Sequence, residues 1–256
     1  MPPSTETIQS DTGLIYRVRR GLPRDGLIVM LHGLSGDENV MWIFDHALPR
    51  SVTVIAPRAL YTSELGGYSW ARSMVRDDLD DVNFQAAIEQ LAQFINEVIA
   101  SYQVDPQRVI LMGFSQGAAL SYAYSLAQPG TLRGVIALAG FFPHPAWRAA
   151  PLSAGKRREQ SGGRSAHPRC STRASVGRLA SPSLRSAQSK DALPHYLIIH
   201  GTHDEAVPID RAQEARSVLE RRGASVEYHE HRVGHKVSAQ GMKEIARWVA
   251  ETLRGF

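Results

Sequence analysis

The sequence predicts an α/β fold in which a mostly parallel central sheet is flanked by helices. Continuous apolar runs typical of buried parallel strands recur along the chain. They alternate with segments whose apolar residues have helical spacing, which favours a doubly wound sheet with right-handed crossovers. With 256 residues, 43% of them hydrophobic and 21% charged, the chain can bury one large core, so we expect residues 1–256 to form a single domain.

The individual elements follow from the pattern in chain order. Strands are expected at residues 14–18, at an edge of the sheet, and at residues 27–31, 52–56, 109–112, 134–140, 195–201 and 225–229. Helices are expected over residues 79–102, directly after residue 115, and over residues 208–222 and 237–253, while residues 57–78 are expected to form a long loop. Four acids at the start of the first helix match the positive end of its dipole and are interpreted as capping residues: Asp77, Asp78, Asp80 and Asp81.

The stretch Gly113-Phe114-Ser115-Gln116-Gly117 lies between an expected strand and an expected helix, the context that a G-x-S-x-G nucleophile elbow requires. A sharp turn there lifts the hydroxyl of Ser115 clear of the sheet, and glycines two positions either side avoid a steric clash. The amide of Gln116 and the helix N-terminus then face an oxyanion formed on an attacked carbonyl. The alternative is a glycine-rich loop that happens to contain a serine.

The expected strand at residues 27–31 ends in a loop of small residues, His32-Gly33-Leu34-Ser35-Gly36-Asp37. Backbone N–H groups in such a loop approach a ligand closely, so the amide of Leu34 is the candidate second oxyanion donor; an ordinary strand-to-helix turn is the alternative. In the long loop that follows, Trp70 is a candidate wall of the substrate pocket. The alternative is a tryptophan that pins the loop to the core.

A serine nucleophile needs a base that takes its proton and an acid that orients this base. Asp204 comes just beyond the expected strand at residues 195–201 and is the preferred acid. Its neighbour Glu205 is the local competitor, and a helix cap is the alternative role for Asp204.

Three histidines are candidates for the base, and the residues alone do not separate them cleanly. His235 is preferred because it follows Gly234 in a loop between the last strand and the last helix. His229 and His231, two positions apart, share a face of a strand and are expected to be exposed there. A metal site is the alternative, but no third ligand of matching spacing stands beside them, so no metal is expected.

Together these segments resemble the phospholipase/carboxylesterase family of α/β-hydrolases, which includes the acyl-protein thioesterases and many bacterial carboxylesterases. The resemblance rests on His32-Gly33-Leu34, on Gly113-Phe114-Ser115-Gln116-Gly117-Ala118, on the loop from Gly201 to Pro208 and on Gly234-His235. It covers the chain from about residue 26 to its end, apart from residues 148–190. It implies the α/β-hydrolase fold, Ser115 as nucleophile, Asp204 as acid, His235 as base, and the amides of Leu34 and Gln116 as oxyanion donors.

Residues 148–190 depart from this pattern. They hold ten Lys or Arg and one acid, a charge of +9 in a chain of +4, so the remainder carries −5. Their few large aliphatic residues offer too little apolar surface to fold alone, so we expect an inserted, low-complexity Arg/Ser-rich flexible segment, and a reading-frame disturbance in the gene is one explanation for it. Because residues 151–190 lack Phe, Tyr and Trp, we expect neither a nucleic-acid partner nor a lid over a long acyl chain.

The sequence therefore predicts a cytoplasmic serine carboxylesterase that hydrolyses short- to medium-chain esters through an acyl-enzyme, without a cofactor. The resemblance adds lysophospholipids and acyl thioesters as substrate classes. The start of the chain lacks the basic-then-apolar run of a secretory signal, the single Cys170 excludes an intramolecular disulfide, and no apolar stretch approaches the ~20 residues that span a bilayer. We expect a monomer or homodimer. The alternative is a weakly active hydrolase-fold scaffold whose basic segment binds anionic partners.

Overall fold

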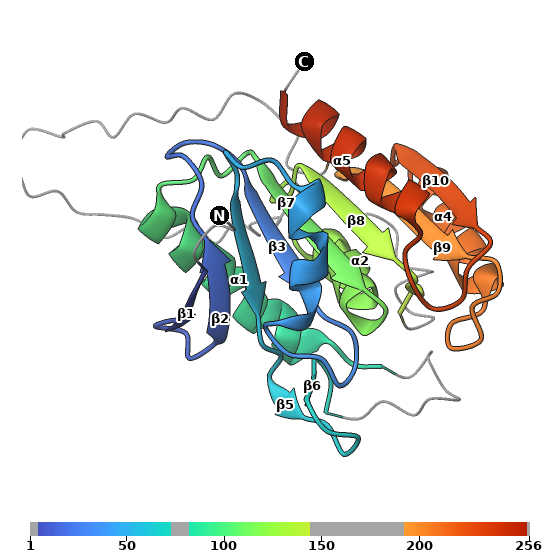
Figure 1. Ribbon diagram of the computed structural model, residues 1–256, viewed down its shortest axis with the longest axis horizontal. Coiled ribbons are helices and arrows are strands. Elements are labelled where there is room, and N and C mark those ends of the chain that lie inside the picture. Colours follow the sequence, from blue (N-terminus) through green and yellow to red (C-terminus); the bar gives the residue numbers. More distant parts are fainter. Residues whose placement is uncertain (1–4, 73–81, 144–191, 255–256) are drawn as a thin grey trace, which may run out of the picture.

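A twisted sheet of eight strands runs through the part of the chain that the structure describes, in the order β1-β2-β4-β3-β7-β8-β9-β10 (Figure 1). The structure is a computed structural model and describes residues 5–72, 82–143 and 192–254. The strands of the sheet are β1 (Glu6–Gln9), β2 (Ile15–Arg19), β3 (Leu27–Leu31), β4 (Thr53–Pro57), β7 (Val109–Phe114), β8 (Gly134–Leu138), β9 (His195–Gly201) and β10 (Val226–His231). A separate hairpin is formed by β5 (Tyr61–Thr62) and β6 (Tyr68–Ser69).

The sheet is mostly parallel, as predicted. All neighbouring strands from β4 to β10 pair in parallel, whereas β2 pairs antiparallel with β4, and β1 antiparallel with β2. The five residues of β3 are all buried because the strand lies inside the sheet and both of its faces are covered. Strand β1 was not predicted, since most of its residues are exposed and it carries little apolar pattern.

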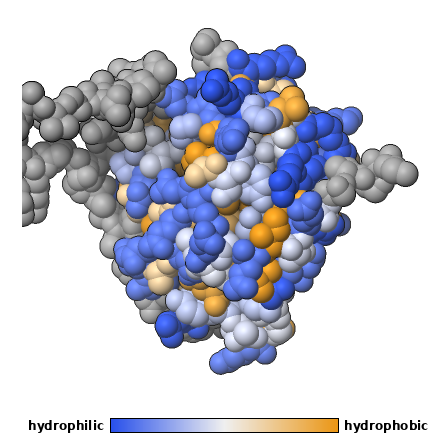
Figure 2. All heavy atoms as spheres, turned by 90° about the vertical axis from the view of Figure 1, so that its left-hand side faces the viewer, coloured by the Kyte–Doolittle hydropathy of each residue, from blue (hydrophilic) through white to orange (hydrophobic). Residues whose placement is uncertain are grey.

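Helices cover both faces of the sheet. On one face lie α1 (Gln85–Tyr102), α2 (Gln116–Ala127) and α4 (Ile209–Arg221); on the other lie the 3-10 helix η1 (Val40–Ala47) and α5 (Ala239–Arg254), which are nearest the viewer in Figure 1. Each face has its own hydrophobic core between sheet and helices. Seen from the β1–β2 edge, the surface is largely hydrophilic, with hydrophobic residues in small separate patches (Figure 2).

The predicted strands and helices are present, with shifts of a few residues at their ends. Besides β1, two features of the N-terminal half differ from the prediction: residues 57–72 are not only loop, since they contain the β5–β6 hairpin, and η1 was not predicted. The four aspartates interpreted as helix caps and the basic segment at residues 148–190, with Cys170, lie outside the described residues.

The loops that follow β3, β7, β9 and β10 all leave the sheet at the carboxyl ends of its strands, because these strands are parallel. The active-site candidates lie at this edge of the sheet. From β3 the chain crosses to β4 on one side, and from β7 it crosses to β8 on the other. Strands β3 and β7 therefore flank the point where the winding direction changes, which is where open α/β sheets bind their ligands.

Candidate active site

Ser115 occupies the sharp turn between β7 and α2. Its backbone, with φ 53° and ψ −116°, lies outside the regions that non-glycine residues ordinarily adopt. The turn brings α2 so close to the sheet that a Cβ on Gly117 would lie 2.1 Å from the carbonyl oxygen of Leu31. This is the strained strand-to-helix turn that the G-x-S-x-G pattern predicts.

The two candidate oxyanion donors lie on the segments that border Ser115. Gln116 begins α2, so its amide belongs to the positive end of the helix dipole. The loop after β3 passes close by, since a Cβ on Gly33 would lie 3.3 Å from the Cβ of Ser115. In this loop the N–H of Ser35 donates to the carbonyl of Tyr68, while the N–H of Leu34 donates to no acceptor among the described residues.

The side chain of Gln116 holds the β6 loop against the elbow. Its Oε1 accepts the backbone N–H of Trp70 at 3.0 Å, and its Nε2 donates to Oγ of Ser69 at 3.0 Å. Trp70 itself is 1% exposed, and its Nε1–H donates to the carbonyl oxygen of His32 at 2.9 Å. The structure thus places Trp70 in the core, where it pins the loop, and not in the wall of the cavity described below. Its predicted role in the wall of the substrate pocket stays a prediction.

His32 is a buried residue that the sequence interpretation did not assign to the site. Its Nε2 accepts the backbone N–H of Ala59 at 3.0 Å, so the proton lies on Nδ1, which donates to the carbonyl oxygen of Gly33 at 2.7 Å. Burial lowers the pKa of His32, against the opposing effect of the Gly33 hydrogen bond. A neutral ring therefore fixes the loop that carries Leu34.

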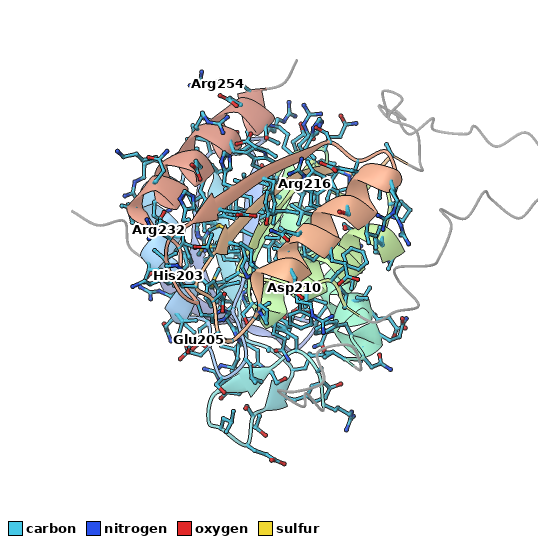
Figure 3. The ribbon with its side chains drawn as sticks, turned by 90° about the vertical axis from the view of Figure 1, so that its right-hand side faces the viewer. His203, Glu205, Asp210, Arg216, Arg232 and Arg254 are labelled. Carbon is cyan, nitrogen blue, oxygen red and sulfur yellow. The ribbon has the colours of Figure 1, made fainter. Side chains whose placement is uncertain are left out.

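The structure brings Asp204 and His235 together. Nδ1 of His235 donates to Oδ2 of Asp204 at 2.8 Å, while Oδ1 of Asp204 accepts the backbone N–H groups of Ala206 and Val207 at 3.0 and 2.9 Å. The side chain of Asp204 is fully buried, whereas its neighbour Glu205 is exposed (Figure 3). The contacts therefore separate Asp204 from its predicted competitor. They also show that Asp204 accepts hydrogen bonds from its own loop.

His235 packs beside the elbow. Its ring lies 4.9 Å from the ring of Phe114, the residue that precedes Ser115. The hydroxyl of Ser115 makes no hydrogen bond within the described residues, and hydrogen bonds of this kind often tighten only when substrate binds. Base and nucleophile are thus on adjacent segments at one edge of the sheet.

His200, at the end of β9, supports the Asp204 loop and was not predicted. Its Nε2–H donates to the carbonyl oxygen of Val207 at 2.8 Å and lies 3.4 Å from Oδ2 of Asp204. The residue is 1% exposed, and its Nδ1 has no partner among the described residues. Burial lowers the pKa of His200, although the nearby Asp204 opposes this effect. A histidine directly after a buried apolar run was the available signal: His32 follows Leu27–Leu31, and His200 follows Ile199 within β9.

The other two candidate bases are engaged elsewhere. On β10, His229 bonds to Glu227 at 2.6 Å and His231 bonds to Glu244 of α5 at 2.9 Å. They share a strand face, as predicted, but both are partly buried and paired with carboxylates, so the expectation of exposed histidines is corrected. Within the described ranges no group of three or more His, Cys, Asp or Glu residues is arranged to hold a metal.

A cavity of about 600 Å³ begins beside His235 and the loop after β3. Helix η1 forms one side, and the residues just before α5 and in its first turn form the other. It is lined by Gly33, Leu34, Ser35, Gly36, Val40, Met41, Ile43, Phe44, His46, Phe114, His235, Lys236, Val237 and Met242. We call it the η1 groove. Its size is typical of pockets that bind small organic ligands.

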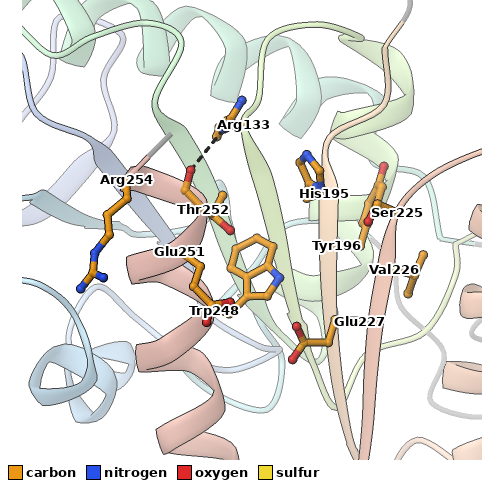
Figure 4. A pocket seen from close by; sticks show the side chains of 10 residues that line it. All are labelled: Arg133, His195, Tyr196, Ser225, Val226, Glu227, Trp248, Glu251, Thr252 and Arg254. Atoms are coloured by element: carbon orange, nitrogen blue, oxygen red, sulfur yellow. Dashed lines mark hydrogen bonds between the residues drawn. The ribbon is translucent and has the colours of Figure 1, made fainter. Parts of the chain in front are cut away.

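A second cavity of about 510 Å³ lies at the opposite end of the sheet, between the first residues of β9 and β10 and the last turns of α5 (Figure 4). Arg133 lines it, with Nε donating to the carbonyl oxygen of Thr252 at 3.2 Å. His195, the histidine that lines it, has no hydrogen bond to a carboxylate within the described part of the chain. This cavity therefore offers no oriented base beside a nucleophile.

A family model described as Phospholipase/Carboxylesterase matches residues 18–156, more than half of the chain. The chain belongs to the phospholipase/carboxylesterase family. It is therefore a serine hydrolase of the class that cleaves carboxylic esters or thioesters, and its sheet and flanking helices form the α/β-hydrolase fold.

Relatives of this phospholipase/carboxylesterase family member are named as thioesterases or as carboxylesterases. The chain is 24% identical to "Acyl-protein thioesterase 1" of Kluyveromyces lactis, covering 91% of this chain and 94% of that protein. It is 25% identical to a protein of Oryza sativa subsp. japonica named "Probable inactive carboxylesterase", covering 90% of this chain and 86% of that protein.

Solved structures match the fold of the family member over nearly its whole length. A carboxylesterase from Mesorhizobium loti superposes with a TM-score of 0.69 at 19% identity, covering 96% of this chain and 98% of that one. The Bacillus cereus carboxylesterase superposes with a TM-score of 0.68 at 15% identity, covering 93% and 94%. Among the helices that the structure describes, none has the length and apolar character needed to cross a membrane.

Proposed function

We propose that this protein hydrolyses short- to medium-chain carboxylic esters through an acyl-enzyme on Ser115. Asp204 is the acid and His235 the base of the triad, and the amides of Leu34 and Gln116 form the oxyanion hole. One observation carries the proposal. The 2.8 Å hydrogen bond from His235 to the buried Asp204 orients an imidazole at the edge of the sheet where Ser115 occupies a strained elbow.

The reaction has two halves. In the first, Oγ of Ser115 attacks the ester carbonyl and passes its proton to Nε2 of His235, while the oxyanion accepts hydrogen bonds from Leu34 and Gln116. His235 then gives this proton to the departing alcohol as the carbon–oxygen bond breaks. In the second half, water attacks the acyl-serine with His235 as base, and the carboxylic acid leaves as Ser115 recovers its proton.

Asp204 supports both halves through its position. Its Oδ1 is occupied by two backbone N–H groups of its own loop, so the carboxylate is fixed and presents Oδ2 to His235. A fixed carboxylate keeps the proton of the neutral imidazole on Nδ1, which leaves Nε2 free to accept the serine proton. An acyl thioester follows the same steps with a thiol as leaving group.

A chromogenic ester tests the proposal. We expect wild-type protein to release p-nitrophenol from p-nitrophenyl butyrate with burst kinetics, and Ser115→Ala to show no release above the uncatalysed rate while it unfolds like wild type. A folded wild-type protein without turnover would instead favour the weakly active scaffold.

A further inference from the structure

The η1 groove has an apolar floor and a surface that remains open. Phe44 and Met41 of η1 are buried beneath it, whereas Val40 and Ile43 are 46% and 67% exposed. These two are among the few large hydrophobic side chains exposed in the described part of the chain. Apolar side chains that face an open groove instead of the core are a signature of a binding surface.

The groove lies on one particular side of the reacting centre. His235 lines it together with Lys236 and Val237, the residues that follow the base, and Met242 of α5. Ser115 does not line it, and neither does the loop from His203 to Val207. Phe114 and the loop from Gly33 to Gly36 also line it, so the groove begins beside the oxyanion loop and has the base in its wall.

This position selects one part of the substrate. When the first half of the reaction ends, Nε2 of His235 must be within hydrogen-bond reach of the oxygen or sulfur that departs. The group attached to that atom is consequently the part of the ester nearest to the wall formed by His235 and Val237. The basic residues lining the groove are His46, Lys236 and His235 itself, and no carboxylate is among the lining residues, so the groove suits a neutral apolar chain and not a cation.

We propose that the η1 groove binds the alcohol or thiol portion of the substrate, and that the natural substrates are esters of apolar alcohols or thiols of medium length. The inference rests on the proposed function, because it assigns the leaving-group side from the role of His235. Ile43 and Val40 are then specificity-determining residues on the outer wall.

Two pairs of esters test the assignment, since each pair places the same carbons on opposite sides of the carbonyl. Hexyl acetate and ethyl hexanoate are constitutional isomers of similar hydrophobicity, as are butyl acetate and ethyl butanoate. Full burial of one methylene corresponds to about a fourfold gain in binding. With the chain partly buried in an open groove, we expect kcat/KM for hexyl acetate to exceed that for ethyl hexanoate by about tenfold, with a smaller ratio for the shorter pair.

A charge placed in the groove should reduce this ratio. Ile43→Asp puts a carboxylate beside the alkyl chain at an exposed position, so the fold is retained and the hexyl acetate to ethyl hexanoate ratio should fall about three- to tenfold. Leu22→Asp is the matched control, because Leu22 is 62% exposed at the opposite end of the sheet and its replacement should leave both rates unchanged.

The possible results distinguish a failure of the groove assignment from a failure of the proposed function. A preference for ethyl hexanoate, a ratio near one, or a ratio that Ile43→Asp does not change would overturn the assignment while p-nitrophenyl butyrate is still turned over. Absence of turnover of every ester would overturn the proposed function, and the groove assignment with it.

Discussion

Gly113 and Gly117 face each other across the turn that carries Ser115: a Cβ on Gly113 would lie 2.2 Å from the carbonyl oxygen of Gly117. Gly117 in turn lies against the backbone of β3, where a Cβ would approach the carbonyl oxygen of Leu31 to 2.1 Å. Both contacts are with main-chain atoms, which cannot rotate away. The elbow fits between the sheet and α2 because neither Gly113 nor Gly117 carries a side chain.

Gly117→Ala should therefore lower the free energy of unfolding by at least about 3 kcal/mol, the upper end for overpacked cores. Denaturant titration measures it. Gly234→Ala is the control, since a Cβ there would make an ordinary contact of 3.5 Å with the carbonyl oxygen of His203. Equal free energies of unfolding for the two variants would contradict the conclusion that the elbow has no room for a Cβ on residue 117.

Replacement of the three candidate histidines by alanine should have different effects on kcat. His235→Ala should lower kcat by about 10⁴, the scale on which loss of a triad member acts. His231→Ala should retain kcat but lose about 1–3 kcal/mol of stability, because it leaves the largely buried Glu244 without its 2.9 Å partner. His229→Ala should leave kcat unchanged. The opposite result, with kcat lost in His231→Ala and retained in His235→Ala, would show that the base is assigned to the wrong residue.

Stability should decrease in mild acid. Burial holds the pKa of His200 and of His32 below their ordinary value of 6.5, so the unfolded chain binds more protons than the folded one as the pH falls. Each residue then contributes stability that is present above about pH 6.5 and is lost below it.

We expect the Tm to fall between pH 7 and pH 5, and to fall less in His200→Gln. Glutamine can keep the hydrogen bond to the carbonyl oxygen of Val207 but does not titrate in this range. Thermal unfolding across this pH range measures the difference between the two proteins. Parallel curves for wild type and His200→Gln would show that His200 does not carry this pH dependence.

The sequence predicted the sheet well where a strand is wholly buried. Residues 27–31 and 195–201 were assigned with the same bounds as β3 and β9, because buried parallel strands form continuous apolar runs. The exposed edge strand β1, the two-residue strands β5 and β6, and the 3-10 helix η1 were missed. Their residues carry little periodic pattern, and tertiary contacts stabilise them, such as the pairing of Gly36 with Tyr68.

The site was predictable where a short motif fixes local geometry, as at the elbow of Ser115. The sequence left two roles open for Trp70, because whether a loop tryptophan faces a pocket or the core depends on Gln116 and His32, which are distant in sequence. His32 and His200 were missed for the same reason. Their function in positioning loops follows from burial and hydrogen bonds that a strand pattern does not contain.

The central claim is that Ser115 forms a covalent acyl-enzyme. Intact mass spectrometry after brief mixing with p-nitrophenyl butyrate, followed by acid quench and peptide mapping, tests it most directly. We predict a butyryl adduct on the peptide that contains Ser115, and no adduct in Ser115→Ala. Turnover of the ester in wild type with the adduct on another residue, or an equal adduct in Ser115→Ala, would contradict the claim.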